Sequence, residues 1–192
     1  MWNLKNKTVV ISGATNGIGK AAAIELSKEN PKLLFTYRNQ HLADELLAEI
    51  KALSPDTLVH SVYCDFSKQD SIKKCADEII DLCGNIDVLI NNAGVVNTSY
   101  HETSEGIENT FAVNHLGYFL FTNLLLHKLK GENEARVVNV SSAAHSFVKE
   151  MQWEDINFKN NFGQGLRPYG QSKLANLLFT RYLSIKLSTE NM

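Results

Sequence analysis

The sequence predicts a doubly wound α/β fold, in which helices cover both faces of a parallel sheet. Short apolar runs alternate along the chain with longer segments whose apolar residues recur every three or four positions. The first of these runs, Thr8 to Ile11, leads through a glycine-rich turn into an alanine-rich helical segment. Repeated strand–helix–strand units build parallel sheets with right-handed crossovers, and their ligands bind at the carboxyl ends of the strands.

The composition fits one domain that extends over residues 1–192. The chain has 192 residues, is 44% hydrophobic, and shows no internal repeat, low-complexity tract or linker. Its formal net charge of -2 provides no general attraction to nucleic acid or to an anionic membrane. No apolar run is long enough for a membrane span or a signal-peptide core, so we expect a cytoplasmic protein.

The cysteines and histidines do not suggest a metal site. Cys64, Cys75 and Cys83 are odd in number and lack C-x-x-C spacing, which favours reduced thiols over disulfides or zinc. The six histidines are scattered along the chain. We therefore expect no metal ion.

The turn after the first strand is the first candidate site. Gly13, Gly17 and Gly19 precede a helix whose unpaired backbone N–H groups and positive dipole end would attract a phosphate. The alternative is that these glycines only permit a tight turn and close packing. The strand–turn–helix context favours a nucleotide site. The predicted phosphate cradle consists of Gly13, Thr15, Asn16, Gly17, Ile18 and Gly19.

Apolar stripes predict the helices that follow the strands. The inner face of the first helix should contain Ile18, Ala22 and Leu26. The next two stripes are Leu42, Leu46, Ile50 and Leu53, and then Ile72, Cys75, Ala76, Ile79 and Cys83. A last helix is predicted to open at Tyr169 and to continue through Leu174 to Leu187, with Leu174, Leu177 and Leu178 in its stripe.

The second strand, Lys32 to Tyr37, is followed directly by Arg38. The end of this strand should face the ribose of a bound dinucleotide, where an acidic residue favours the 2′-hydroxyl of NAD and an arginine favours the 2′-phosphate of NADP. No carboxylate precedes Asp44 to compete with Arg38. We therefore predict NADP(H), with NAD(H) as the less favoured cofactor. The alternative for Arg38 is a solvated surface side chain.

The third and fourth strands also end in polar residues. Asp65 follows the strand Leu58 to Tyr63, and it could accept a hydrogen bond from an adenine amino group or cap a helix that starts near Ser67. The strand Ile86 to Ile90 leads into Asn91 to Gly94, whose small and amide side chains could pin neighbouring backbone or form an ordinary turn. Both alternatives stay open in each case.

The segment from Thr103 to Lys130 reads as mostly one long helix. Because apolar side chains surround most of its circumference, it should be buried against the sheet, and part of its surface could face a partner. Asn114 is the one amide within its most apolar part, and a buried amide requires hydrogen-bond partners. From the local sequence it could simply bond nearby backbone.

Two further motifs stand in the last third of the chain. Ser141 and Ser142 follow the fifth strand, Arg136 to Val140, where serines are commonly turn or cap residues. Tyr169 and Lys173 are four residues apart, so they share one face of a helix. A nearby ammonium stabilises a phenolate, although an isolated Tyr and Lys at this spacing could equally be surface residues.

Taken together and in this order, the motifs resemble those of the short-chain dehydrogenase/reductase family over nearly the whole chain. The glycine spacing, Asn91 to Gly94, Asn114, the serine pair and the Tyr169 motif carry this resemblance. The run Val138 to Ser142 and the long excursion from His145 to Pro168 are similar to the retinol dehydrogenase-like branch.

The resemblance implies a Rossmann-type fold that transfers a hydride between NADP(H) and a small-molecule carbonyl or alcohol. Tyr169 would donate or accept the proton, and Lys173 would stabilise its phenolate and hold the nicotinamide ribose. Ser142 would position the substrate oxygen, with Ser141 as the alternative, and Asn114 would hold a relay water. The cofactor would contact Gly13, Thr15, Asn16, Gly17, Ile18, Gly19, Arg38, Asp65, Asn92, Ala93, Gly94, Tyr169 and Lys173.

The resemblance also implies features of the whole molecule. In the family further strands follow the last helix, so we expect C-terminal strands to be missing here and turnover to be slow. A homodimer through the helix at 103–130 is a further expectation. Two rival functions remain: a sugar-nucleotide epimerase or dehydratase of the extended branch, and a cofactor-binding or scaffold protein without turnover.

Overall fold

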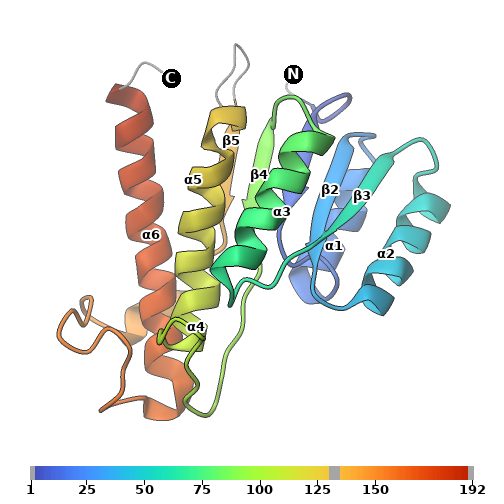
Figure 1. Ribbon diagram of the computed structural model, residues 1–192. Coiled ribbons are helices and arrows are strands. Elements are labelled where there is room, and N and C mark those ends of the chain that lie inside the picture. The colour runs from blue at the N-terminus through green and yellow to red at the C-terminus, as the bar shows by residue number, and fades with distance from the viewer. Residues whose placement is uncertain (1–2, 130–134, 190–192) are drawn as a thin grey trace.

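The computed structural model describes residues 3–129 and 135–189, and it confirms the predicted fold class. A parallel five-stranded sheet has the order β3-β2-β1-β4-β5 within this part of the chain (Figure 1). The strands are β1 (Thr8–Ile11), β2 (Lys32–Tyr37), β3 (Leu58–Tyr63), β4 (Val88–Asn91) and β5 (Arg136–Asn139). The chain progresses outward from β1 to β3 and then returns to the other side of β1, so the strand order reverses between β1 and β4.

Helices cover both faces of this sheet (Figure 1). They are α1 (Gly17–Ser27), α2 (Gln40–Leu53), α3 (Gln69–Leu82), α4 (Asn109–Phe111), the π-helical segment η1 (Ala112–Leu116), α5 (Gly117–Leu129) and α6 (Leu166–Thr189). Two short 3₁₀ turns, η2 (Ala143–Phe147) and η3 (Gly163–Gly165), lie between β5 and α6. The end of the helix predicted at Lys130 falls outside the described residues.

The alternation of side chains along β1 divides the core into two layers. Val9 and Ile11 pack in one cluster with Leu46 of α2, whereas Val10 packs in the other with Ile79 of α3 and Phe121 of α5. All six residues are fully buried. This burial on both faces explains why the strand reads as a continuous apolar run rather than an alternating one.

The inner face of α1 differs from the prediction. Ile18 is 76% exposed, and the buried residues of this helix are Gly19, Ala23 and Ser27. A Cβ atom at Gly19 would lie 2.3 Å from the carbonyl oxygen of Gly13. Because the helix approaches its own N-terminal turn so closely, small residues face inward and the large Ile18 is turned out toward solvent.

The long helix begins later than predicted. Residues from Thr103 to Glu108 form a turn in which Thr103 N donates to the carbonyl oxygen of Ile107 at 2.8 Å. The carboxylate of Glu108 then accepts hydrogen bonds from the N–H groups of Thr110 and Phe111 at 2.8 and 2.7 Å. This N-cap fixes the helix start at 109 rather than 103, because it satisfies two of the otherwise unpaired donors.

The last helix buries a different side from the one that its leucines predict. It begins at Leu166, slightly before the predicted start at Tyr169, and Leu177 and Leu178 are 42% and 48% exposed. Its fully or almost fully buried side chains include the polar residues Gln171, Ser172, Lys173 and Asn176. A polar face can be buried in this way only where hydrogen-bond partners meet it.

Three further features bear on the whole molecule. Strand β5 lies at one edge of the described sheet. No helix within the described ranges is long and apolar enough to span a membrane. Cys64, Cys75 and Cys83 are free thiols, and all three are buried.

Candidate active site

A cleft of about 950 Å³ lies at the carboxyl ends of the strands, where the strand order reverses. All thirteen residues that the sequence nominates for the cofactor line this cleft: Gly13, Thr15, Asn16, Gly17, Ile18, Gly19, Arg38, Asp65, Asn92, Ala93, Gly94, Tyr169 and Lys173. The lining also contains Thr36, Tyr37, Asn39, Leu42, Cys64, Phe66, Val95, Val96, Val113 and Val140. Residues far apart in the sequence are therefore brought to one site.

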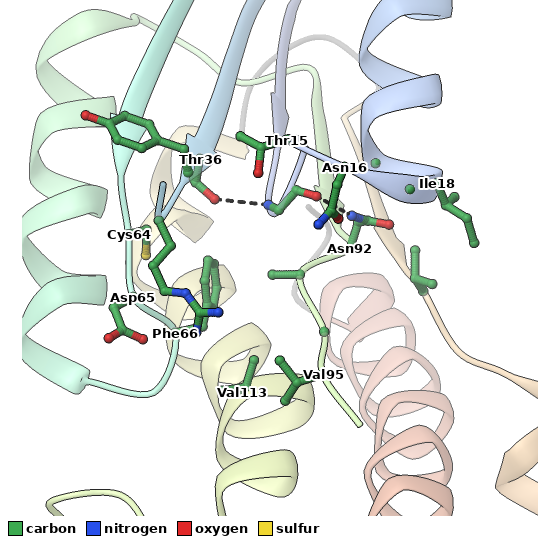
Figure 2. A pocket seen from close by; sticks show the side chains of 18 of the residues that line it. Thr15, Asn16, Ile18, Thr36, Cys64, Asp65, Phe66, Asn92, Val95 and Val113 are labelled. Atoms are coloured by element: carbon green, nitrogen blue, oxygen red, sulfur yellow. Dashed lines mark hydrogen bonds between the residues drawn. The ribbon is translucent and has the colours of Figure 1, made fainter. Parts of the chain in front are cut away.

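The glycine turn is tied to its neighbours at both ends. Gly13 N donates to Thr36 Oγ1 at 3.1 Å, and Asn92 Nδ2 donates to the Gly13 carbonyl oxygen at 2.9 Å (Figure 2). Gly13 has φ +66°, and a Cβ atom there would lie 2.6 Å from the Cα of Ala93. Both the backbone conformation and the close approach to Ala93 therefore require glycine.

The N-terminus of α1 fits an anionic group. Its N-cap residue, Asn16, makes no side-chain capping hydrogen bond, and no acidic residue stands in the first turn. Gly17 has φ +53° and nothing within 4 Å of the position of a Cβ atom, so the turn opens into the cleft. Uncapped backbone N–H groups at the positive end of a helix favour a phosphate. The residues present thus fit the pyrophosphate of a dinucleotide.

The far end of the cleft contains the exposed Arg38 and the almost buried Asp65. Asp65 Oδ1 accepts hydrogen bonds from Ser67 N and Ser67 Oγ at 3.0 and 2.7 Å, which is a local capping interaction. Helix α3 starts two residues beyond Ser67, at Gln69. Asp65 still lines the cleft, so its second oxygen remains compatible with a ligand.

Several effects act on the charge of Asp65. Burial alone would raise the pKa of this carboxyl, but hydrogen bonds from Ser67 and the positive charges of Lys68 and Arg38 outweigh burial and lower it. The carboxylate is therefore ionised at neutral pH. Figure 2 shows Asp65 and Phe66 on one side of the cleft and Asn92 and Ile18 on the other.

Tyr169 and Lys173 lie together in the first turns of α6, and both line the cleft. The Lys173 ammonium lies 5.6 Å from the centroid of the Tyr169 ring. Its Nζ donates to the carbonyl oxygen of Val140 at 3.1 Å, and the residue is only 4% exposed. Burial lowers the pKa of Lys173 to about 8, so the side chain stays mostly cationic at neutral pH.

Asn114 is fully buried, and its side chain connects two segments. Its Oδ1 accepts from Val95 N at 2.8 Å, while its Nδ2 donates to the carbonyl oxygen of Val95 and to Ser172 Oγ at 2.9 and 3.2 Å. Both side-chain N–H groups are thus engaged. Asn114 does not line the cleft directly. A relay water could therefore bind this residue only by donating a hydrogen bond to one of its oxygens.

The two serines after β5 make different contacts. Ser141 Oγ donates to the carbonyl oxygen of Lys173 at 2.9 Å, which ties the end of β5 to α6. Ser142 Oγ accepts from Ala144 N at 3.2 Å, as the N-cap of η2. Neither serine lines the cleft. Because the Ser141 hydroxyl hydrogen is used within the protein, Ser142 retains a hydroxyl hydrogen for a ligand.

Two residues that shape the site, Ser12 and Thr36, were not among the site residues predicted from the sequence. Ser12, fully buried, accepts from Asn92 N and Ala93 N at 2.9 and 3.1 Å, and so joins the glycine turn to the end of β4. Thr36 accepts from the glycine turn, as described above. The signal for Thr36 is its hydroxyl within an otherwise apolar strand. Ser12 could have been found from its place between a buried strand and the first glycine.

The sequence is similar to that of a known family of dehydrogenases and to curated members of it. Residues 7–154 match the model of the short chain dehydrogenase family. Retinol dehydrogenase 13 of Homo sapiens is 37% identical over 184 residues, which cover 96% of this chain and 55% of the relative. The chain thus spans about half the length of that curated relative.

Solved structures have the same fold. A putative uncharacterized protein from Mycobacterium paratuberculosis superimposes with a TM-score of 0.85 at 34% identity, over 98% of this chain and 65% of that one. A metagenomic short-chain oxidoreductase solved in complex with NADP has a TM-score of 0.78 at 24% identity, over 97% of this chain and 78% of that one. With the family model matched over most of its length, the chain belongs to the short-chain dehydrogenase family, and it is similar to the retinol dehydrogenases within it.

Proposed function

We propose that this chain is an NADP(H)-dependent oxidoreductase that transfers a hydride between the cofactor and a carbonyl or alcohol substrate. The observation that carries the proposal is that Tyr169 and Lys173 line the same cleft as the glycine turn and Arg38. A dinucleotide whose phosphates lie at the N-terminus of α1 would therefore reach Arg38 with one end and Tyr169 and Lys173 with the other. NADPH is preferred over NADH in this proposal because Arg38 places a cation directly after the end of β2.

The bound nicotinamide would supply or accept the hydride. Tyr169 would give its phenolic proton to the carbonyl oxygen during reduction, or take the hydroxyl proton during oxidation. The Lys173 ammonium, 5.6 Å from the Tyr169 ring, would stabilise the phenolate and bind the nicotinamide ribose. Ser142 would position the substrate oxygen. A relay water would be bound by an oxygen of Asn114.

The class of substrate is a small-molecule carbonyl or alcohol, and similarity to a retinol dehydrogenase makes apolar aldehydes the first choice for testing. The proposal also includes a homodimer. Exposed apolar side chains on α5 and α6, among them Phe119, Leu178 and Tyr182, offer a surface for it. A cytoplasmic location remains part of the same proposal.

The test is to purify the chain and follow the absorbance of NADPH or NADH with a panel of aldehydes and ketones. We expect oxidation of NADPH with at least one apolar aldehyde. The control is Tyr169→Phe, which removes the proton donor and little binding surface, so turnover should be abolished while the dissociation constant for NADPH stays within about twofold. NADPH binding without turnover of any substrate would favour the rival function, a cofactor-binding protein. Turnover by Tyr169→Phe at the wild-type rate would refute the mechanism.

A further inference from the structure

We propose that Asn176 is a positioning residue for this hydride transfer, because its carboxamide binds the Val140 carbonyl oxygen that also accepts from the Lys173 ammonium, together with the Asn114 carbonyl oxygen of a neighbouring helix. This inference rests on the proposed function. Asn176 does not line the cleft, so it would act through Lys173 rather than on the substrate.

The contacts of Asn176 use its whole side chain. The residue is fully buried in α6. Its Nδ2 donates to the carbonyl oxygen of Asn114 at 2.9 Å and to that of Val140 at 3.3 Å, and its Oδ1 lies 3.0 Å from His115 Nδ1. Because an amide oxygen can only accept, His115 Nδ1 carries the hydrogen of this last contact.

The carbonyl oxygen of Val140 is shared between Asn176 and Lys173. It accepts from Lys173 Nζ at 3.1 Å and from Asn176 Nδ2 at 3.3 Å. Among the described residues, no other hydrogen-bond acceptor is shown for this ammonium. Val140 N donates to the Asn91 carbonyl oxygen at 2.9 Å, so the backbone of this residue is also attached to the end of β4. Asn176 therefore helps to fix the atom that decides where the ammonium lies, three residues away on the same side of α6.

The carbonyl oxygen of Asn114 belongs to the π-helical segment η1. Gly117 N donates to the carbonyl oxygen of Ala112, five residues earlier, and such a shift in register changes which carbonyl groups the helix itself satisfies. The Asn176 amide supplies a donor to Asn114 from a different helix. It thereby fixes the widened turn against α6 at the level of Lys173.

Few side chains could replace asparagine here. The position requires two donors, one for each carbonyl group, and one acceptor for His115, all within the reach of a short side chain. Leucine has the same number and branching of side-chain heavy atoms and can make none of these bonds. Serine has one hydroxyl donor and can serve only one carbonyl group. Leucine should therefore remove all of these hydrogen bonds, whereas serine should keep one of them.

The experiment compares Asn176→Leu, Asn176→Ser and wild type in two measurements. The first is kcat for the best carbonyl substrate with NADPH. The second is the titration of Lys173 in protein that contains ¹³C-labelled lysine, with the Lys173 resonance assigned from Lys173→Arg. This titration needs no turnover. If the wild type reduces no substrate, the proposed function fails, while the titration still decides the role of Asn176.

The expected results follow from loss of the hydrogen bond by which Asn176 holds the Val140 carbonyl group. Asn176→Leu should lower kcat by about tenfold to a hundredfold, because small displacements of catalytic groups are costly. The Lys173 titration midpoint should rise from about 8 toward the ordinary value of 10.5, since an ammonium that is no longer held at Val140 turns to solvent. Tyr169 and Tyr118, whose ring centroids lie 5.6 and 6.0 Å from the ammonium, are the titratable neighbours that must be followed in parallel. Asn176→Ser should fall between wild type and Asn176→Leu in both measurements.

Thr180→Val is the matched control. Thr180 lies one turn further along α6, where its Oγ1 donates to the carbonyl oxygen of Asn176 and accepts from Asn139 Nδ2. It also links α6 to β5, but neither of these hydrogen bonds involves Val140. All variants are assayed below their measured melting midpoints. Thr180→Val should leave kcat and the Lys173 midpoint unchanged.

The proposal is overturned if the Asn176 variants match wild type in the titration, or if Thr180→Val loses kcat as strongly as they do. If Asn176→Leu does not fold, the same comparison is made with Asn176→Ser.

Discussion

Arg38 is the residue on which cofactor choice is expected to depend. Its side chain is exposed at the edge of the cleft, and a charge-assisted hydrogen bond to phosphate contributes about 1.5 to 3 kcal/mol. Arg38→Ala should therefore weaken NADPH binding by roughly tenfold or more and leave NADH binding nearly unchanged. Titration of the two cofactors by calorimetry measures both effects.

Lys68 provides a control for the general effect of positive charge. It is exposed, and its Nζ lies 3.7 Å from Asp65 Oδ2, but it does not line the cleft. Lys68→Ala should change NADPH affinity far less than Arg38→Ala does. Equal dissociation constants for NADPH and NADH in the wild type would contradict the assignment of Arg38.

Lys173 illustrates a conflict between activity and stability at one residue. Its lowered pKa means that the ammonium is less favourable in the folded chain than in the unfolded chain. This cost is fully present below pH 8 and disappears as the pH rises through the window between about 8 and 10.5. Lys173→Met should abolish turnover and yet stabilise the cofactor-free protein at pH 7 by about 1 to 3 kcal/mol.

Urea unfolding at two pH values tests this prediction. The stability difference between Lys173→Met and wild type should shrink as the pH approaches 10.5. Lys51→Met, at an exposed position on α2, should show no such dependence on pH. A Lys173→Met protein that is less stable than wild type at pH 7 would show that the contacts of the ammonium outweigh its desolvation.

Among the elements, the helix that carries Asn114 depends on one buried cap. Glu108 is fully buried, and its two carboxylate oxygens accept the hydrogen bonds from Thr110 and Phe111 that begin α4. Burial raises the pKa of Glu108, while the hydrogen bonds from these N–H groups act in the opposite direction. Glu108→Ala should destabilise the protein by about 1 to 2 kcal/mol, the usual cost of losing an N-cap.

The control for this change lies three residues upstream. Glu105 is an exposed glutamate in the same turn, and Glu105→Ala should alter stability by less than about 0.5 kcal/mol. Thermal unfolding of both variants decides the matter. If Glu108→Ala melts at the same temperature as wild type, the start of the helix does not depend on the cap.

At the scale of the whole molecule, apolar side chains remain uncovered on one side. Phe119 of α5 and Leu178 and Tyr182 of α6 are all exposed, and these two helices lie side by side in Figure 1. We expect the purified chain to self-associate through them as a homodimer, since exposed apolar patches commonly mark interfaces. Leu178→Glu should convert the dimer to a monomer in sedimentation experiments, because a carboxylate would be buried without a partner.

Leu53→Glu is the matched control for the dimer. Leu53 is an exposed leucine at the end of α2 and does not belong to the surface formed by α5 and α6. This variant should sediment like wild type. A wild-type chain that stays monomeric at all concentrations, or a Leu178→Glu chain that still dimerises, would exclude this interface.

Much of the fold and of the cleft could be predicted because the signals are local. β-branched runs such as Thr8 to Ile11 form strands buried on both faces, and the glycine turn must be followed by a helix N-terminus. The order of the strands and helices then brings the strand ends to one edge of the sheet. Thus Gly13, Arg38 and Tyr169 could be assigned to one site from sequence, and all three line the cleft.

The predicted stripe of α3 is buried, but tertiary structure alone decided which side of α1 and α6 is buried. The leucines of α6 predict an apolar inner face, yet Asn176 and Lys173 are buried and Leu178 is exposed. The cause is that polar side chains gain their partners, such as the Val140 carbonyl oxygen, only when β5 and η1 meet α6. Sequence periodicity records the apolarity of side chains, but it contains no information about hydrogen bonds between residues that are distant along the chain.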